Sequence, residues 1–278
     1  MEQVSIRESI AHLNDEWLFY LSPRFLSYRP KIKINVKTEK YTLKTADSMP
    51  ELVELFRLRH SIFLEENQAE NMLDVDQFDS ECDHIVIKCN ATNEICGTYR
   101  VITANNHVGF YSETEFKLDE FLSGNEVKME LGRACIHPYH RNGIVIDLLW
   151  KGIGSYAMAI NADILFGCSS MPVVSNTKCC TLMNYLKKND YYSEEYKIQT
   201  QPKFHYEIQE NTCDLFSENE IKKMLPPLLV SYINAGAKVF GKPAFDQEFN
   251  CLDFLTILKL KDLKSSFKKR YFKDGTES

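Results

Sequence analysis

The sequence predicts an α/β protein with a mixed, partly antiparallel central sheet flanked by helices, and three observations point to this fold class. Segments with strand and helix periodicity alternate along the chain. The apolar runs His84 to Cys89 and Ile95 to Ile102 are separated only by Asn90 to Glu94, which is typical of a β-hairpin. Ser48-Met49-Pro50-Glu51 matches the capping box that begins a helix.

The remaining elements follow from the same periodicity. A strand over Tyr41 to Thr45 precedes the capped helix, and another strand lies within Val127 to Gly143, "VKMELGRACIHPYHRNG". The later elements are a helix from about Gly143 to Asn161, a strand over Ile164 to Gly167, a helix over Asn176 to Lys188, a helix opened by Met224 to Leu229 and a last strand over Phe254 to Leu260.

Composition narrows the classes of function. The formal net charge of −6 argues against nucleic-acid binding, which needs a basic surface. The nine cysteines have no regular spacing, and several lie in apolar runs, which indicates a reducing cytoplasm. Met1 to Tyr20 lacks the apolar core of a secretory signal, and charges interrupt Ile144 to Phe166, so neither segment predicts membrane insertion. A contact with a membrane surface stays open.

The capped helix places Arg59 on its inward stripe, beside Leu55, Phe56 and Phe63. An isolated buried guanidinium is costly, so Arg59 requires an acidic partner. The sequence offers this partner in the loop that carries Asp74, Asp76 and Asp79, which precedes the hairpin. These carboxylates are expected to hold Arg59 or Arg100, or to bind ammonium groups of a substrate.

Glu130 and Arg133 place opposite charges inside a predicted buried strand. Residues three apart in a regular strand point to opposite faces, but a bulge at Gly132 would re-aim the side chains and leave backbone N–H groups unpaired. A carboxylate base, an arginine and free N–H groups suit acyl transfer to an amine, since the N–H groups stabilise a tetrahedral intermediate. The alternative is a structural Glu–Arg pair.

The charged residues also carry a family resemblance. In type and order they resemble the signature of the acyl-homoserine-lactone synthases, which have a GNAT-like acyltransferase fold and use acyl carrier protein as acyl donor. Asp74 stands where that signature has a glutamate. The matching residues are Arg59, Phe63, Asp74, Asp76, Asp79, Arg100, Glu130 and Arg133.

The chain as a whole, from about Arg59 to Leu258, resembles more closely the bacterial ornithine Nα-acyltransferases, which are often labelled haemolysin-like. The motifs that carry this resemblance are "CGTYRV", "GFYSETEF", "ELGRACIHP", "LLWKGIGSY", "LFGCSS", "LPPLL" and "FNCLDF". The resemblance implies transfer of a 3-hydroxyacyl chain from acyl carrier protein to the α-amino group of ornithine, which gives a lyso-aminolipid. Ser170-Met171-Pro172 departs from the family pattern, where an aromatic residue and a glycine are expected.

Three alternatives to this function remain. Close relatives of the family acylate glycine, so a glycine-specific N-acyltransferase is the first. The second is an acyl-homoserine-lactone synthase, which would use S-adenosylmethionine. The third, from a different class, is a non-catalytic haemolysin-like protein that binds lipid.

The sequence assigns roles to the site residues as follows. Glu130 is the expected base, backbone N–H groups of Ala134 and Cys135 the oxyanion donors, and Arg100 and Arg133 either bind the acceptor carboxylate or anchor the acidic loop. The substrate-binding set is Arg59, Phe63, Asp74, Asp76, Asp79 and Arg100. The truncated loop Arg141-Asn142-Gly143 is expected to bind the single phosphate of an acyl-phosphopantetheine at a helix N-terminus.

No metal and no permanently bound cofactor is expected. Cys135, His137 and His140 lack a recognisable fourth ligand for zinc. Asp74, Asp76 and Asp79 lack the glycine and the terminal glutamate of a calcium loop.

Three regions are predicted along the chain. Residues 1–40 form an N-terminal helical arm and a basic segment, residues 41–262 a GNAT-like acyltransferase domain with a C-terminal extension, and residues 263–278 a basic, flexible tail. The protein is expected in the cytoplasm, with a peripheral contact to the cytoplasmic membrane left open. Acidic acyl carrier protein needs a local basic surface on an acidic enzyme. The two candidates are Arg24 to Lys37 and the C-terminal set Lys259, Lys261, Lys264, Lys268, Lys269, Arg270 and Lys273.

Overall fold

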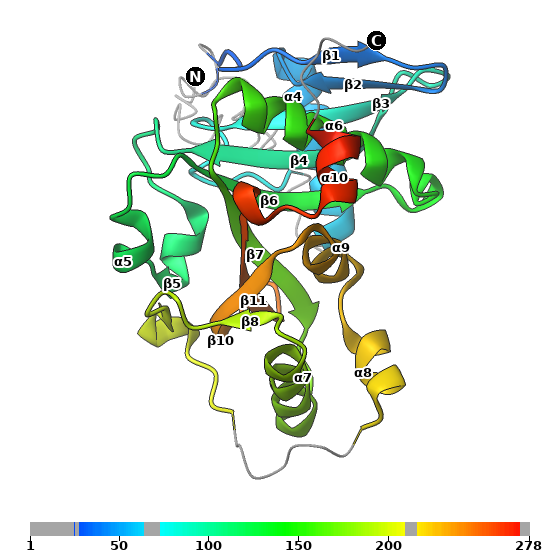
Figure 1. Ribbon diagram of the computed structural model, residues 1–278. Helices are drawn as coiled ribbons and strands as arrows, with labels where there is room; N and C mark the ends of the chain where they lie inside the picture. Colours follow the sequence, from blue (N-terminus) through cyan, green and yellow to red (C-terminus); the bar gives the residue numbers. More distant parts are fainter. Residues whose placement is uncertain (1–24, 26–27, 64–72, 209–215, 273–278) are drawn as a thin grey trace, which may run out of the picture. The chain divides into compact units, whose positions relative to one another are not determined.

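The computed structural model describes residues 25, 28–63, 73–208 and 216–272. These residues form two compact units. Unit 1 draws on Met1–Ile102 and Arg133–Tyr156, and unit 2 on Thr103–Gly132 and Ala157–Ser278. Strand β6 (Lys128–Ile136) and helix α6 (Ile144–Ala159), both labelled in Figure 1, each contribute residues to both units. The predicted arm lies mostly outside the described residues, and the predicted division into three regions stays a prediction.

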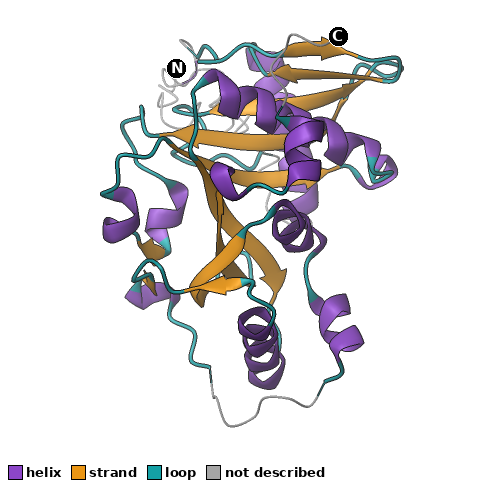
Figure 2. Ribbon diagram, in the orientation of Figure 1, coloured by secondary structure: helices purple, strands orange, loops and turns teal. Residues whose placement is uncertain are grey.

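Unit 1 contains one antiparallel part of the mixed sheet. Strand β3 pairs antiparallel with β2 on one side and with β4 on the other. In the β3–β4 hairpin Ile85 lies opposite Tyr99, and β6 follows β4 in the strand order of the sheet. The predicted strand over Tyr41 to Thr45 and the predicted hairpin are therefore confirmed (Figure 2). The strands of this part are β1 (Asn35–Lys37), β2 (Tyr41–Thr45), β3 (Asp83–Cys89) and β4 (Ile95–Thr103).

Helices α4 and α6 pack in unit 1. Helix α4 (Met49–Phe63) buries Leu52, Leu55 and Phe56 completely, as its apolar spacing predicts. Helix α6 approaches the sheet closely at Gly152, where an added Cβ would lie 2.8 Å from Leu43 and Ile85.

The capping box at α4 differs in detail from the prediction. The Glu51 carboxylate accepts from the backbone N–H of Asp47, one residue before Ser48, and also from the Lys44 ammonium. The helix entry is thus held by a partner outside the predicted box.

Unit 2 contains strands in the order β6, β7, β11, β10 and β8. β6 and β7 pair parallel, as do β8 and β10, whereas β11 pairs antiparallel with both β7 and β10. The sheet is therefore mixed, as predicted. Its strands are β7 (Ile164–Pro172), β8 (Tyr192–Ser193), β10 (Lys238–Asp246) and β11 (Cys251–Lys259), and β5 (Phe116–Lys117) pairs separately with β9 (Gln199–Thr200).

Strand β7 extends five residues beyond its predicted end, Gly167, to Pro172. Gly167 permits this continuation because it passes close to β6: an added Cβ would lie 2.1 Å from the Leu131 carbonyl oxygen. The extension carries Cys168, Ser169 and Ser170 alongside β11.

The helical elements of unit 2 also refine the prediction. α7 has the predicted bounds, but Met224 ends α8 and Pro227 begins α9, because proline favours a helix start and opposes continuation. Buried side chains of α7, α8 and α9 share an apolar cluster with β10 and β11. These elements are η1 (Tyr111–Thr114), α5 (Asp119–Leu122), α7 (Asn176–Lys188), η3 (Pro202–Phe204), α8 (Glu218–Met224), α9 (Pro227–Ala235), η5 (Leu260–Asp262) and α10 (Ser265–Tyr271).

Among the helices that the structure describes, none has both the length and the apolar character needed to cross a membrane.

Candidate functional site

Arg59 lies in unit 1 in a buried group of charges. Its Nε donates to Asp74 Oδ2 at 2.6 Å, and its Nη1 and Nη2 donate to the two Asp79 carboxylate oxygens at 2.7 and 3.2 Å. Arg59 and Asp79 are both 0% exposed. The expectation that a buried Arg59 pairs with the acidic loop is confirmed.

Arg100 and Arg133 contact the same loop. Arg100 Nη1 donates to Asp76 Oδ2 at 2.6 Å and to Asp79 Oδ1 at 3.2 Å. Arg133 Nη2 donates to Asp76 Oδ2 at 3.3 Å, and its Nε lies 3.5 Å from Asp74 Oδ2. Of the two roles predicted for Arg100 and Arg133, these contacts correspond to anchoring the acidic loop.

The electrostatics fit a permanent ion cluster. Burial alone would raise the pKa of Asp79, but the Arg59 and Arg100 guanidiniums outweigh burial and hold that pKa well below its usual range. Burial lowers the pKa of the neighbouring His84 to about 4, so this imidazole is neutral at pH 7. We call Arg59, Asp74, Asp76, Asp79, Arg100 and Arg133 the arginine–aspartate cluster. Its predicted role in substrate binding stays a prediction, as does that of Phe63, which packs against the apolar core of unit 1.

Glu130 lies in unit 2, on the part of β6 that pairs with β7. Its carboxylate accepts three hydrogen bonds from η1: Oε2 from the Tyr111 N–H at 2.6 Å, and Oε1 from the Ser112 N–H at 2.7 Å and the Ser112 hydroxyl at 2.5 Å. Glu130 is buried, so these donors compensate the loss of its hydration.

The backbone irregularity predicted at Gly132 falls one residue later. Arg133 has φ 49°, a left-handed conformation that is uncommon for a residue with a side chain. Beyond it Ala134 is half-buried and Cys135 is buried. Burial raises the pKa of the Cys135 thiol to about 12, which excludes it as a thiolate nucleophile near pH 7. The oxyanion role of the Ala134 and Cys135 N–H groups stays a prediction.

The predicted donor loop leads directly into α6. Arg141 Nε donates to the Ile136 carbonyl at 3.0 Å, and the Asn142 side chain accepts from the Ile144 N–H at 3.0 Å. Gly143 has φ 83°, and a Cβ at this position would meet no atom within 4 Å. The loop is therefore open at the first turn of the helix.

Sequence reasoning missed a second set of buried carboxylates, Glu115, Asp246 and Asp253, in unit 2. The motifs "GFYSETEF", "LFGCSS" and "FNCLDF" contain Glu115, Cys168 and Asp253, and the structure brings these three residues together. The shared family motifs were therefore the signal that could have identified them.

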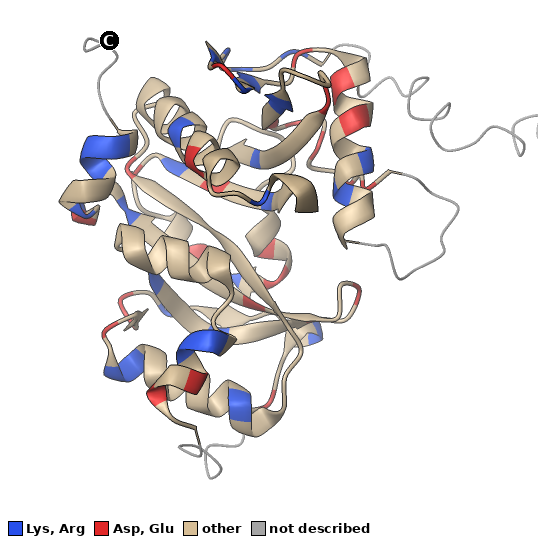
Figure 3. Ribbon diagram, turned by 90° about the vertical axis from the view of Figure 1, so that its right-hand side faces the viewer, with Lys and Arg blue, Asp and Glu red and all other residues tan. Residues whose placement is uncertain are grey.

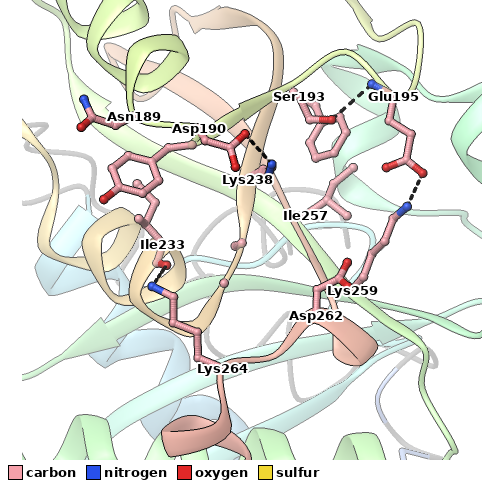
Figure 4. A pocket seen from close by; sticks show the side chains of 14 residues that line it. Asn189, Asp190, Ser193, Glu195, Ile233, Lys238, Ile257, Lys259, Asp262 and Lys264 are labelled. Carbon is pink, nitrogen blue, oxygen red and sulfur yellow. Dashed lines mark hydrogen bonds and ion pairs between the residues drawn. The ribbon is translucent and has the colours of Figure 1, made fainter.

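A cavity of about 450 Å³ also lies in unit 2, between the end of α7, β10 and η5 (Figure 4). Its lysines bind neighbouring groups: Lys238 pairs with Asp190 at 2.7 Å, Lys259 with Glu195, and Lys264 donates to the Ile233 carbonyl. None of the residues predicted to bind substrate or act in catalysis lines it.

The fold and these residues define a class of enzyme. A family model described as an acetyltransferase (GNAT) domain matches residues 58–151, the segment that holds the whole arginine–aspartate cluster, Glu130 and the donor loop. The chain is an acyltransferase with a GNAT-like fold, and an acyl donor follows from this chemistry.

Individual relatives agree with the predicted resemblance. The L-ornithine N(alpha)-acyltransferase of Rhizobium meliloti is 29% identical over 84% of both chains. That of Agrobacterium fabrum is 28% identical over 77% of this chain and 79% of its own. The solved structure of the AHL synthase LasI aligns with a TM-score of 0.46 and 12% identity over 87% of this chain and 96% of its own. The resemblance to ornithine Nα-acyltransferases is confirmed.

Proposed function

We propose that the protein transfers a 3-hydroxyacyl chain from acyl carrier protein to the α-amino group of ornithine, forming a lyso-aminolipid. The observation that carries this proposal is the similarity to L-ornithine N(alpha)-acyltransferases over 84% of both chains. The general reaction, acyl transfer, agrees with the match of residues 58–151 to the GNAT domain model.

In this proposal the α-amine attacks the thioester carbonyl directly. Glu130 accepts the proton of the α-ammonium, directly or through a water, before the new C–N bond forms. Backbone N–H groups of Ala134 and Cys135 stabilise the oxyanion, the C–S bond then breaks, and the phosphopantetheine thiol leaves with a proton. The arginine–aspartate cluster fixes the conformation of the acidic loop.

The phosphopantetheine phosphate is assigned to Arg141, Asn142 and Gly143. Positive partial charge and free N–H groups at a helix start favour a phosphate, and α6 has sixteen residues. The absence of a side chain at Gly143 leaves room for the phosphate to approach the backbone.

Mass spectrometry of reaction products tests the proposal. Purified protein should form N-acylornithine from acyl carrier protein loaded with a 3-hydroxyacyl chain, and much less product from the matching coenzyme A thioester. A product that requires S-adenosylmethionine would identify a lactone synthase instead. No amide product with any amino acid would refute the proposed function.

The donor should be guided to the protein by the basic last turn of α10. Lys268, Lys269 and Arg270 are exposed there, and the α10 ribbon is largely blue just before the grey C-terminal trace (Figure 3). Reversing all three to Glu should raise KM for acyl carrier protein and leave KM for ornithine nearly unchanged. The defect should shrink as salt rises, because screening acts over about 8 Å at physiological ionic strength.

A matched control reverses Lys178, Lys188 and Lys223, which are also exposed in unit 2 and change the net charge equally. If both triple variants raise the carrier-protein KM alike, net charge rather than local docking is responsible. Loss of binding to anionic liposomes with an unchanged carrier-protein KM would instead make α10 a membrane contact.

A further inference from the structure

Three carboxylates from two distant parts of the sequence converge in unit 2. Ligand atoms of Glu115, Cys168 and Asp253 lie within 4.8 Å of one another, and those of Asp246, Cys251 and Asp253 do so as well. Asp253 belongs to both groups and joins them. We call Glu115, Asp246 and Asp253 the acidic triad.

The acidic triad differs from the arginine–aspartate cluster in its surroundings. All three of its carboxylates are at most 5% exposed. Among the residues that the structure describes, neither Glu115 nor Asp246 forms an ion pair with a lysine or arginine, and Glu115 Oε1 is buried without a hydrogen-bond partner. A buried carboxylate oxygen without a donor is costly, so the site of Glu115 is incomplete when this residue is ionised.

The groups that face Glu115 also disfavour its ionised form. Burial, then the Asp253 carboxylate and more weakly Asp246, raise the pKa of Glu115 to about 8, while the Tyr111 and Cys168 side chains oppose this shift. The protein alone therefore keeps a proton on Glu115 at pH 7. A cation bound between the carboxylates would replace that proton.

We propose that Glu115, Asp246 and Asp253 bind the side-chain ammonium of a diamino-acid acceptor. This inference rests on the proposed function and makes the acidic triad the part of the protein that distinguishes ornithine from glycine or other uncharged amino acids. A primary ammonium offers three N–H donors and one positive charge. It would supply the hydrogen bond that Glu115 Oε1 lacks and place a positive charge beside the buried carboxylates.

The acidic triad is connected to Glu130. The Cys168 thiol donates to Glu115 Oε2 at 3.4 Å, and its sulfur lies 3.4 Å from the Ser112 hydroxyl, which donates to Glu130. Two side chains thus span the interval between the acidic triad and the proposed base. In the proposed arrangement the side-chain ammonium of the acceptor binds the acidic triad and its α-amine faces Glu130.

Ser170 gives this region contact with solvent. It is exposed, and its hydroxyl donates to Asp253 Oδ1 at 2.5 Å. The position that departs from the family pattern therefore lies directly on the acidic triad.

A metal ion fits the sulfur atoms poorly. The Cys251 thiol donates to Asp253 Oδ2 at 3.4 Å, and burial together with the nearby Asp253 carboxylate raises its pKa far above the usual value. Burial and Glu115 act likewise on Cys168. Metal ligation requires thiolates, whereas these sulfurs keep their protons as hydrogen-bond donors.

The test compares ornithine with norvaline, which has the same carbon chain without the side-chain ammonium. Wild-type protein should prefer ornithine. Glu115→Gln should lower kcat/KM for ornithine about 10- to 100-fold, which is the effect of losing one hydrogen bond to a charged group. The same substitution should leave kcat/KM for norvaline unchanged. Asp246→Asn should act in the same direction if Glu115→Gln does not fold. Asp119→Asn, an exposed carboxylate in α5, is the matched control and should change neither value.

Calorimetry supplies a readout independent of turnover. At pH 7, ornithine binding to wild-type protein should release protons, because Glu115 must ionise, and binding to Glu115→Gln should release fewer. Affinity should rise with pH up to about 8, as the fraction of ionised Glu115 rises.

Three results would overturn the inference. One is wild-type protein that acylates norvaline as efficiently as ornithine. Another is that Glu115→Gln and Asp246→Asn lower kcat/KM for ornithine and for norvaline equally. The third is one equivalent of a metal ion in purified wild-type protein that Asp246→Asn loses. Each of these leaves acyl transfer to an amino acid intact, whereas absence of every amide product refutes the proposed function itself.

Discussion

Replacing Glu130 by Gln should lower kcat about 10²- to 10⁴-fold, since the amide keeps the side-chain shape but cannot accept the proton of the α-ammonium. The loss should appear in kcat rather than in KM for the acyl donor. Steady-state kinetics with saturating donor measure it directly.

The hydrogen bonds of Glu130 make a structural control essential. A Gln amide nitrogen cannot accept from the Tyr111 and Ser112 N–H groups as the carboxylate does, so some loss of stability is expected. Ser112→Ala removes the hydroxyl donor and leaves both backbone contacts, and it should reduce kcat far less. A folded Glu130→Gln protein with near-normal turnover would make Glu130 an anchor of η1 and exclude it as the base.

Asp79→Asn should be the most destabilising single substitution in the arginine–aspartate cluster. Asp79 binds both Arg59 and Arg100 in a fully buried site, so neutralising it leaves guanidinium charge uncompensated. Breaking a buried pair in this way costs about 3–5 kcal/mol. Urea denaturation followed by circular dichroism measures the free energy of unfolding.

Glu218→Gln provides the comparison, because it breaks the exposed pair with Lys222 and should leave the free energy of unfolding nearly unchanged. The pH dependence has a definite sign. The pKa of Asp79 is depressed, so its contribution is complete above the ordinary value of 3.8 and is lost progressively as the pH falls below it. The difference between wild type and Asp79→Asn should narrow in the same window. Equal stability of the two proteins at pH 7 would contradict the role assigned to the cluster.

The pairing of Arg59 was predictable because one rule, the cost of an unpaired buried charge, acts within a short stretch of sequence. The inward helix stripe fixed the position of Arg59, and the acidic loop offered partners nearby. The bounds of α7 at Asn176 and Lys188 were predictable from equally local signals, since the Ser175 side chain caps the first turn.

Strand β10 escaped prediction because Gly241, Lys242 and Pro243 interrupt its pattern. The structure accommodates them in an irregular register between Phe240 and Ala244, with Gly241 at φ 71°. The acidic triad escaped for another reason: its residues come from two strands and from the C-cap of a 3-10 helix, and no local periodicity links them. Only the pairing of β7 with β11 and β11 with β10 brings Cys168, Asp246 and Asp253 together.

The interrupted course of the chain through unit 1 has a consequence for biosynthesis. The ribosome completes Met1–Ile102 and then makes thirty residues of unit 2, Thr103–Gly132, before Arg133 emerges. Until then, Asp74 and Asp76 lack one of their arginines, and α6 has not been made. A nascent chain that has reached only Ile102 would therefore hold a partial ion cluster, and unit 1 is complete only when translation reaches Tyr156.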